Sequence, residues 1–220
     1  MPTEKISAII PAHNEERTVG AVVDTVRAAG FFDRIIVVSD GSHDRTAEVA
    51  RQSGATVVEL AKNQGKGSAV AVGLAQTDSP LACFLDADLV GLTAAYLAAL
   101  AEPVLSGRWV MSVGMWDRGP VSNFLARFLP LISGQRVLRR EVFEDLPPKF
   151  RSGYGMEAAM THACRSGHLP FGRVFLPRLK IVRKFAKVGL FPGLVGYVRM
   201  FRQVLGVMVA VRLDPTRQAD

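Results

Sequence analysis

The sequence predicts an α/β protein with a mostly parallel central sheet flanked by helices. In the amino-terminal part of the chain, short apolar runs rich in β-branched residues alternate with segments of helical period. Continuous apolar strands separated by helices are typical of a parallel sheet that is covered on both faces. Polar or turn-forming residues follow these strands, so we expect carboxylates at the carboxyl edge of the sheet, where open α/β sheets bind ligands.

The first elements follow from these patterns in order. A strand is expected at 6–10 (Ile-Ser-Ala-Ile-Ile), then a helix at 16–29 with its valines on one face, and a strand at 35–38 (Ile-Ile-Val-Val). A helix at 45–53 is closed by Gly54. A third strand at 55–60, a helix of small residues at 66–76 and an apolar strand at 81–85 that leads into Asp86 complete this part.

The pattern is looser after Asp88. The segments expected there are helices at 92–105, 121–131, 139–146 and 154–166, extended segments at 109–114 and 171–176, and an apolar, basic C-terminal helix at 190–213. No repeat or low-complexity linker divides the chain.

The composition suits one globular domain. The chain has 220 residues, of which 49% are hydrophobic and 21% charged. The net charge is +7, and Asp214 is the only acidic residue between Arg165 and Arg217. This basic end suits an anionic partner, or it is a solvated basic face.

Three features predict a cytoplasmic protein. Cys83 and Cys164 give no disulfide framework, so we expect reduced thiols. Residues 1–5 lead straight into a strand, which predicts no signal peptide. No apolar run of roughly 18 uncharged residues occurs, so no spanning helix is predicted.

The segment Asp86-Ala87-Asp88 is the strongest signal of chemistry. It places two carboxylates directly after the apolar run 81–85. Carboxylates two residues apart can share a divalent cation, and such a cation can neutralise a diphosphate. The sequence therefore predicts a metal-dependent phosphate site at this strand end.

Polar segments at other strand ends could join that site. In the segment 11–16 (Pro-Ala-His-Asn-Glu-Glu), a cap and a favourable dipole contact already account for Asn14 and Glu15 taken singly. Asp40 precedes the Gly41 turn, where its carboxylate could accept hydrogen bonds from a base or a ribose. The glycines around Lys66 would let the backbone approach an anion, although a solvated surface lysine explains this segment equally well.

Taken together, these segments resemble the family 2 glycosyltransferases, which have the GT-A, Rossmann-like fold. Pro-Ala-His-Asn-Glu-Glu, Ser-Asp-Gly-Ser-His-Asp, Gln-Gly-Lys-Gly and Leu-Asp-Ala-Asp carry the resemblance across residues 5 to 92. It continues more weakly through 132–136 and 153–157, which look most like the branch containing the glucosyl-3-phosphoglycerate synthases.

The resemblance implies a metal-dependent hexosyltransferase that uses a UDP- or GDP-sugar with Mg²⁺ or Mn²⁺. It implies one GT-A domain over 1–220, with a nucleotide-sugar half at 1–92, an acceptor half at 93–185 and a helical tail at 186–220. Its acceptor, a small molecule or a lipid-linked one, stays open, as does the stereochemical outcome. The rival functions are a nucleotidyltransferase and a non-catalytic nucleotide-sugar-binding protein; no nucleic acid partner is predicted.

The resemblance also implies roles for single residues. Pro11, Ala12 and Glu15 would line the nucleoside pocket, and Asp40 would bind the base with Lys66 beside it. Asp86 would face the ribose or sugar and join the metal site, in which Asp88 would be the main ligand. Glu157 would act near the acceptor, as a general base or as a substrate contact.

One departure from the synthase branch concerns a histidine that its members often supply to the metal from a C-terminal segment. The matching segment here, 179–184, has none, so Arg183 or Lys184 could carry part of that charge on the diphosphate. The basic tail could pack on the sheet, form a homodimer face or lie on the inner, anionic face of the membrane, and we favour the first two.

Overall fold

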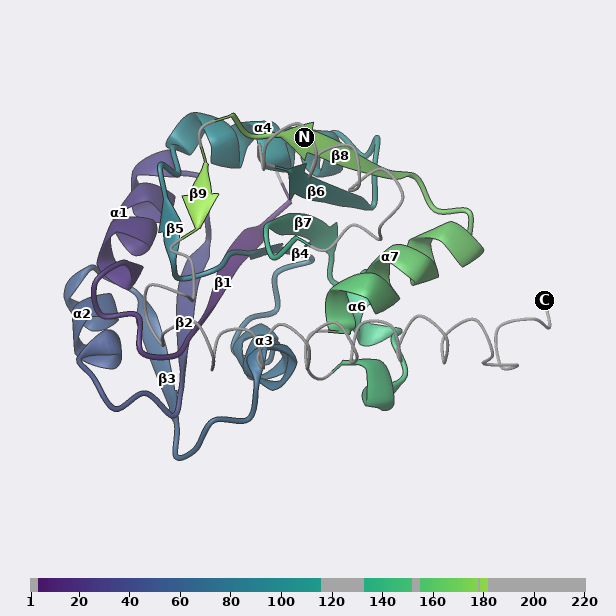
Figure 1. Cartoon of the computed structure of the whole chain (residues 1–220). Helices are drawn as coiled ribbons and strands as arrows, with labels where there is room; N and C mark the ends of the chain where they lie inside the picture. The colour runs from purple at the N-terminus through teal and green to yellow at the C-terminus, as the bar shows by residue number, and fades with distance from the viewer. Residues whose placement is uncertain (1–3, 116–132, 152–154, 178, 182–220) are drawn as a thin grey trace, which may run out of the picture.

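The computed structural model describes residues 4–115, 133–151, 155–177 and 179–181. Their main feature is a seven-stranded sheet of order β3-β2-β1-β4-β7-β6-β8 (Figure 1). The strands are β1 (Ile6–Ala12), β2 (Arg34–Asp40), β3 (Thr56–Leu60), β4 (Leu81–Phe84), β6 (Met111–Met115), β7 (Arg136–Arg139) and β8 (Phe171–Phe175). A second sheet pairs β5 (Leu89–Val90) with β9 (Lys180–Ile181).

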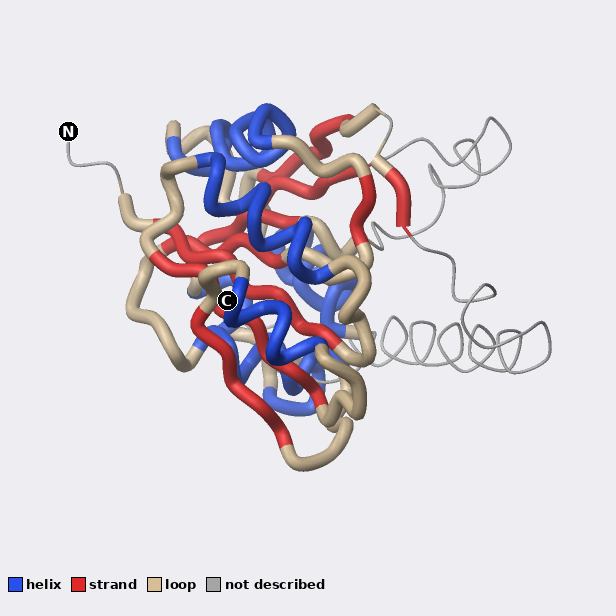
Figure 2. The backbone as a smooth tube through the Cα atoms, turned by 90° about the vertical axis from the view of Figure 1, so that its left-hand side faces the viewer, coloured by secondary structure: helices blue, strands red, loops and turns tan. Residues whose placement is uncertain are grey.

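Helices cover both faces of the large sheet, as the sequence predicts. They are α1 (Val19–Ala29), α2 (Thr46–Gln52), α3 (Lys66–Leu74), α4 (Ala94–Leu105), α6 (Glu141–Glu144) and α7 (Met156–Ser166), with a 3₁₀ turn at Pro148–Phe150. Figure 2 shows α1 and α2 in front of the strands.

Alternation along β1 builds the two halves of the core. Ile6, Ala8 and Ile10 pack in one cluster with α1 and α4, whereas Ile9 packs in the other with α3 and α7. Successive residues of a strand point to opposite faces, so one buried strand serves both helical layers. At Gly73 a Cβ would collide with Ile9, which explains why α3, a helix of small residues, can lie against β1.

The strand directions confirm a mostly parallel sheet. β1 pairs in parallel with both β2 and β4, and β2 pairs in parallel with β3. β7 is the exception, since it runs antiparallel between β4 and β6. The helix expected at 139–146 is accordingly shorter, at Glu141–Glu144, because Arg139 pairs with Leu81 in the sheet.

Several expectations concern residues outside the described ranges: the helix at 121–131, the C-terminal helix at 190–213, and Arg183 with Lys184. Among the described residues, no helix is long and apolar enough to cross a membrane. Both cysteines are buried and free, as predicted.

Candidate active site

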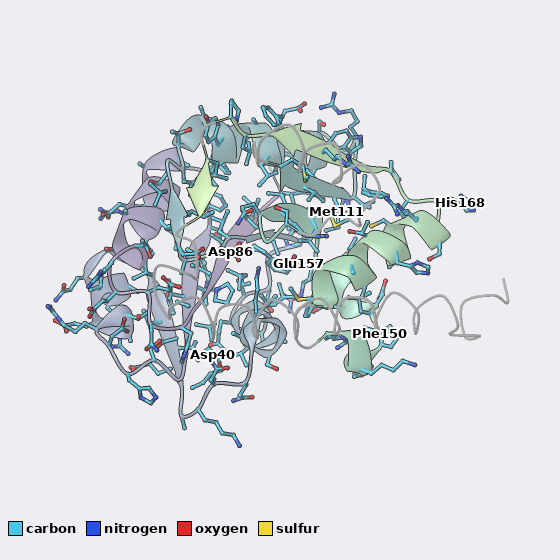
Figure 3. The ribbon with its side chains drawn as sticks, viewed as in Figure 1. Asp40, Asp86, Met111, Phe150, Glu157 and His168 are labelled. Atoms are coloured by element: carbon cyan, nitrogen blue, oxygen red, sulfur yellow. The ribbon has the colours of Figure 1, made fainter. Side chains whose placement is uncertain are left out.

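Three of the predicted site residues, Lys66, Asp86 and Glu157, meet close to the point where the chain order of the sheet reverses. β2 and β3 lie on one side of β1, and β4 lies on the other. A crevice forms outside the carboxyl ends of the strands at such a reversal, and it is the usual ligand site of open α/β sheets. In Figure 3, Asp86 and Glu157 lie close together near the centre, and Asp40 lies apart from them, toward the end of β2.

Lys66 joins two of the predicted carboxylates. Its Nζ lies 2.6 Å from Asp86 Oδ1 and 2.7 Å from Glu157 Oε1. Lys66 begins α3, Asp86 follows β4, and Glu157 lies in the first turn of α7, so three distant parts of the chain meet here. The exposed side-chain fractions are 19% for Lys66, 20% for Asp86 and 7% for Glu157, so the ion pairs are shielded but not fully buried.

The charge state of Lys66 follows from this setting. Burial disfavours its ammonium, but the carboxylates of Asp86 and Glu157 outweigh that effect and raise the pKa of Lys66 above its ordinary value. Lys66 is therefore a fixed positive charge at neutral pH. It can donate hydrogen bonds and balance acidic side chains, but it cannot act as a base.

The segment before β7 completes the cluster. Gln135 Nε2 donates to Asp86 Oδ2 at 2.7 Å, and Ser133 Oγ lies 2.9 Å from Gln135 Oε1. Between them, a Cβ at Gly134 would collide with the Asp86 carboxylate and with the Lys66 ammonium. Only a glycine lets these charged groups lie directly against the backbone here.

Arg136 lies fully buried behind the cluster. Its Nε donates to the carbonyl oxygen of Ser133 at 2.8 Å, and its Nη1 lies 3.2 Å from the Thr161 hydroxyl. Burial lowers the pKa of the Arg136 guanidinium, and the negative charge of Glu157 opposes that shift. The site thus holds two cationic and two anionic side chains in one connected group.

Asp40 has a structural task in this fold. It is 3% exposed, and its two carboxylate oxygens accept the backbone N–H groups of Gln64 at 2.7 Å and Gly65 at 2.8 Å. These bonds fix the loop that leads into α3 and so place Lys66. Its predicted contact with a base stays a prediction.

The loop after β1 is joined to the loop after β2. His13 Nδ1 lies 2.7 Å from the carbonyl oxygen of Asp40, and the backbone N–H of Glu15 donates to the Thr46 hydroxyl at 2.7 Å. Ala12 is buried beneath this loop, and Pro11 and Glu15 are half-buried. Their predicted nucleoside contacts are compatible with this position beside the reversal point and stay predictions.

Asp88 is half-buried and lies two residues after Asp86. Within the described ranges, no group of three or more His, Cys, Asp or Glu side chains could hold a metal ion by itself. Mg²⁺ is usually held by one or two carboxylates together with substrate phosphates and water. Asp86 also pairs with Lys66 and Gln135. The metal roles predicted for Asp88 and Asp86 stay predictions.

The sequence reasoning missed the three residues before and at the start of β7. Gly134, Gln135 and Arg136 all adjoin the Asp86–Lys66–Glu157 cluster. The segment Ser-Gly-Gln-Arg was a usable signal, because a small residue beside an amide and a guanidinium is unusual at the start of a buried strand. Without the antiparallel register of β7, however, nothing places it beside Asp86.

The sequence is similar to that of known proteins. Residues 7–160 match the profile of the family described as Glycosyl transferase family 2. A curated relative, the glucosyl-3-phosphoglycerate synthase of Mycobacterium tuberculosis, is 30% identical over 193 residues, which cover 70% of this chain and 59% of that protein. The chain thus spans about three fifths of the length of that relative.

Solved structures extend the likeness beyond the matched segment. The synthase from Mycobacterium tuberculosis in complex with Mn²⁺, UDP-glucose and phosphoglyceric acid superposes with a TM-score of 0.81 at 27% identity, covering 94% of this chain and 79% of that one. The same synthase in complex with Mg²⁺ and UDP gives a TM-score of 0.80 at 28% identity, with 94% and 79% coverage.

Proposed function

The chain belongs to glycosyl transferase family 2, and from this premise we propose that it transfers glucose from UDP-glucose to a small acceptor with the help of Mg²⁺ or Mn²⁺. The observation that carries the proposal is the Asp86–Lys66–Glu157 cluster at the reversal point of the sheet, with Asp88 beside it. UDP-glucose and these cations are the ligands of the similar synthase structures.

The roles of the residues follow from their chemistry. Asp88 would hold the cation, whose positive charge stabilises the departing diphosphate. Asp86, Lys66 and Glu157 offer acceptors and donors at one place, which suits the hydroxyl groups of a hexose. The base and the ribose would be contacted by Asp40, Pro11, Ala12 and Glu15.

For Glu157 the structure favours a substrate contact over a general base. Its Oε1 accepts a charge-assisted hydrogen bond from Lys66 at 2.7 Å. Taking up a proton from an acceptor hydroxyl would weaken that bond, which supports a contact without proton transfer. As an acceptor of hydrogen bonds, Glu157 can hold a hydroxyl group without receiving a proton from it.

The two halves of the chain have different proposed ligands. We propose that residues 1–92 bind the nucleotide-sugar and residues 93–185 face the acceptor. The predicted cytoplasmic location, the tail at 186–220 and its dimer or membrane contacts stay predictions.

The experiment measures nucleoside diphosphate release. Purified protein is incubated with UDP-glucose, GDP-glucose and GDP-mannose, with Mn²⁺ or with EDTA, and with phosphoglycerate, glycerol phosphate or lipid-linked acceptors. We expect metal-dependent UDP release that an acceptor stimulates.

Each rival function gives a different result. Release of pyrophosphate from a nucleoside triphosphate and a sugar phosphate would identify a nucleotidyltransferase. Donor binding without any turnover would identify a non-catalytic protein. Either result contradicts the proposal.

A further inference from the structure

We propose that Gln135 is a positioning residue for the donor sugar: it fixes the carboxylate of Asp86 so that Asp86 serves the sugar, while Asp88 serves the cation. The inference rests on the proposed function, because it assigns a task within the same site.

Each carboxylate oxygen of Asp86 accepts a hydrogen bond from a different side chain. Lys66 Nζ lies 2.6 Å from Oδ1, and Gln135 Nε2 lies 2.7 Å from Oδ2. One partner comes from the start of α3 and the other from the segment before β7. Because each oxygen has its own donor, the plane of the carboxylate is fixed from two sides.

Gln135 is itself held in place. It is fully buried, its Oε1 lies 2.9 Å from Ser133 Oγ, and its backbone carbonyl accepts the N–H of Gly114 at 2.8 Å. An amide oxygen turned toward Asp86 would face a carboxylate, so the network assigns the NH₂ group to that side. The amide therefore has one stable orientation, with its donor on Asp86.

The place of Asp86 in the fold indicates which part of the donor it serves. Asp86 lies with Glu157 on the side of β7 and α7, whereas Asp40 lies toward the end of β2 (Figure 3). Under the proposed function, the base of the nucleotide-sugar lies on the side of Asp40 and the sugar lies at the cluster. Substituting Gln135 should therefore weaken contacts with the sugar and leave those with UDP and the cation in place.

The variant Gln135→Leu tests this because it keeps the approximate size and removes the donor. We expect the affinity for UDP-glucose to fall about tenfold or more, because a displaced Asp86 carboxylate would lose a charge-assisted hydrogen bond to the sugar. The affinity for UDP and the Mn²⁺ concentration needed for half-maximal binding should stay within about twofold of wild type. Calorimetry with each ligand measures this difference, and KM for UDP-glucose should rise with its Kd.

The variant Gln135→Glu adds a readout that a merely structural role would not move. The new carboxylate would face Asp86, with Lys66, Glu157 and Arg136 as the other charged groups of the cluster. Repulsion between the two carboxylates would displace that of Asp86. We expect this variant to lose affinity for UDP-glucose and to keep its affinity for UDP, a difference that a general loss of stability would not produce.

The matched control is Thr77→Val. Thr77 is also buried in a hydroxyl network, with Ser7 and Ser79, but it lies before β4, at the opposite end of that strand from Asp86. This variant should lower the melting temperature and leave the affinity ratio of UDP-glucose to UDP unchanged.

The outcomes separate the inference from the proposed function. Wild-type protein that does not bind UDP-glucose overturns the proposed function. If wild type binds it, an unchanged UDP-glucose affinity in Gln135→Leu overturns the role of Gln135, and so does an equal loss for UDP and UDP-glucose. Should Gln135→Leu fail to fold, Gln135→Asn must lose affinity for UDP-glucose and keep its affinity for UDP, because its shorter amide cannot span the distance to Asp86.

Discussion

Among single residues, Lys66 has the most consequential contacts, because two carboxylates depend on it. Lys66→Met would leave Asp86 and Glu157 facing each other without their cation. We expect the free energy of unfolding to fall by about 3 kcal/mol. This is the lower end of the range for breaking a buried ion pair, because part of the cluster is exposed. Urea unfolding at pH 7 measures it.

The pH dependence of that loss has a defined sign. The pKa of Lys66 is raised in the fold, so the stability it contributes is fully present below the pKa of an unfolded lysine, about 10.4, and is lost as the pH rises through the folded value. The difference between wild type and Lys66→Met should stay constant from about pH 6 to 9. A difference that already declines between these values would contradict the assignment of a fixed charge.

Glu157→Gln separates the two roles weighed for this residue, because it keeps the shape and removes the charge. For a substrate contact, we expect KM for the acceptor to rise about tenfold, while kcat stays within a few-fold of wild type. A general base would instead lose on the order of a hundredfold in kcat at unchanged donor affinity. Steady-state kinetics with donor and acceptor varied separately decide between them, and wild-type values for both would remove Glu157 from the site.

Asp88→Ala tests the proposed cation ligand. We expect transfer to be abolished and UDP-glucose to bind wild type in Mn²⁺ much more tightly than the variant, because the diphosphate loses its counter-charge. In EDTA the two proteins should bind the donor alike. Full activity of the variant, or of wild type in excess EDTA, would exclude a metal-dependent reaction through Asp88.

At the scale of elements, Asp44 joins the loops after β1 and β2. Its carboxylate accepts the backbone N–H and the hydroxyl of Thr46 at the start of α2, and also the backbone N–H of Glu16. Burial raises the pKa of Asp44, but these hydrogen bonds outweigh it and lower that pKa. We expect Asp44→Ala to cost about 1 kcal/mol in the free energy of unfolding at neutral pH, as for a lost helix cap.

The sign with pH is opposite to that of Lys66. A depressed pKa means that the contribution of Asp44 is present above the unfolded value, about 3.9, and is lost as the pH falls through the folded value. Denaturation of wild type and Asp44→Ala at pH 7 and pH 3 should show the difference shrinking in acid. The control is Asp24→Ala, which removes an exposed ion pair with Arg27 and should cost little at either pH.

The elements also show how far the sequence predicts this fold. The strands and helices up to Asp86 follow from local apolar periodicity, and the structure has them within a few residues of the predicted bounds. β7 is different, because four residues at Arg136–Arg139 give too short a pattern to separate a strand from a helix start. Its antiparallel place between β4 and β6 is a long-range property that no local pattern encodes.

The same limit applies to the site. The positions of Asp86 and Asp88 after a strand and of Glu157 in the first turn of a helix could be predicted, because each follows a recognisable segment; their roles stay predictions. The pairing of Lys66 with Glu157, 91 residues away, and the contact of Gln135 with Asp86 could not, because they exist only once α3, α7 and β7 pack around β4. Sequence motifs thus predict which residue types the site contains, and the packing decides which of them touch.

At the scale of the whole molecule, donor binding should stabilise the native state through the cation. The loops after β1 and β2 and the cluster beside β4 lie on the same edge of one sheet, so a bound nucleotide would connect them. At a UDP concentration of a hundred times its Kd, linkage predicts about 2.7 kcal/mol of stabilisation, which raises Tm by roughly 5–10 °C for a chain of this size.

Thermal unfolding with UDP and Mn²⁺, compared with UDP and EDTA, measures how much of this increase needs the metal. We expect most of it to disappear in EDTA and in Asp88→Ala, and to persist in Gln135→Leu, whose defect concerns the sugar. An equal increase in EDTA would mean that the nucleotide is held by protein groups alone and that Asp88 does not act through a cation.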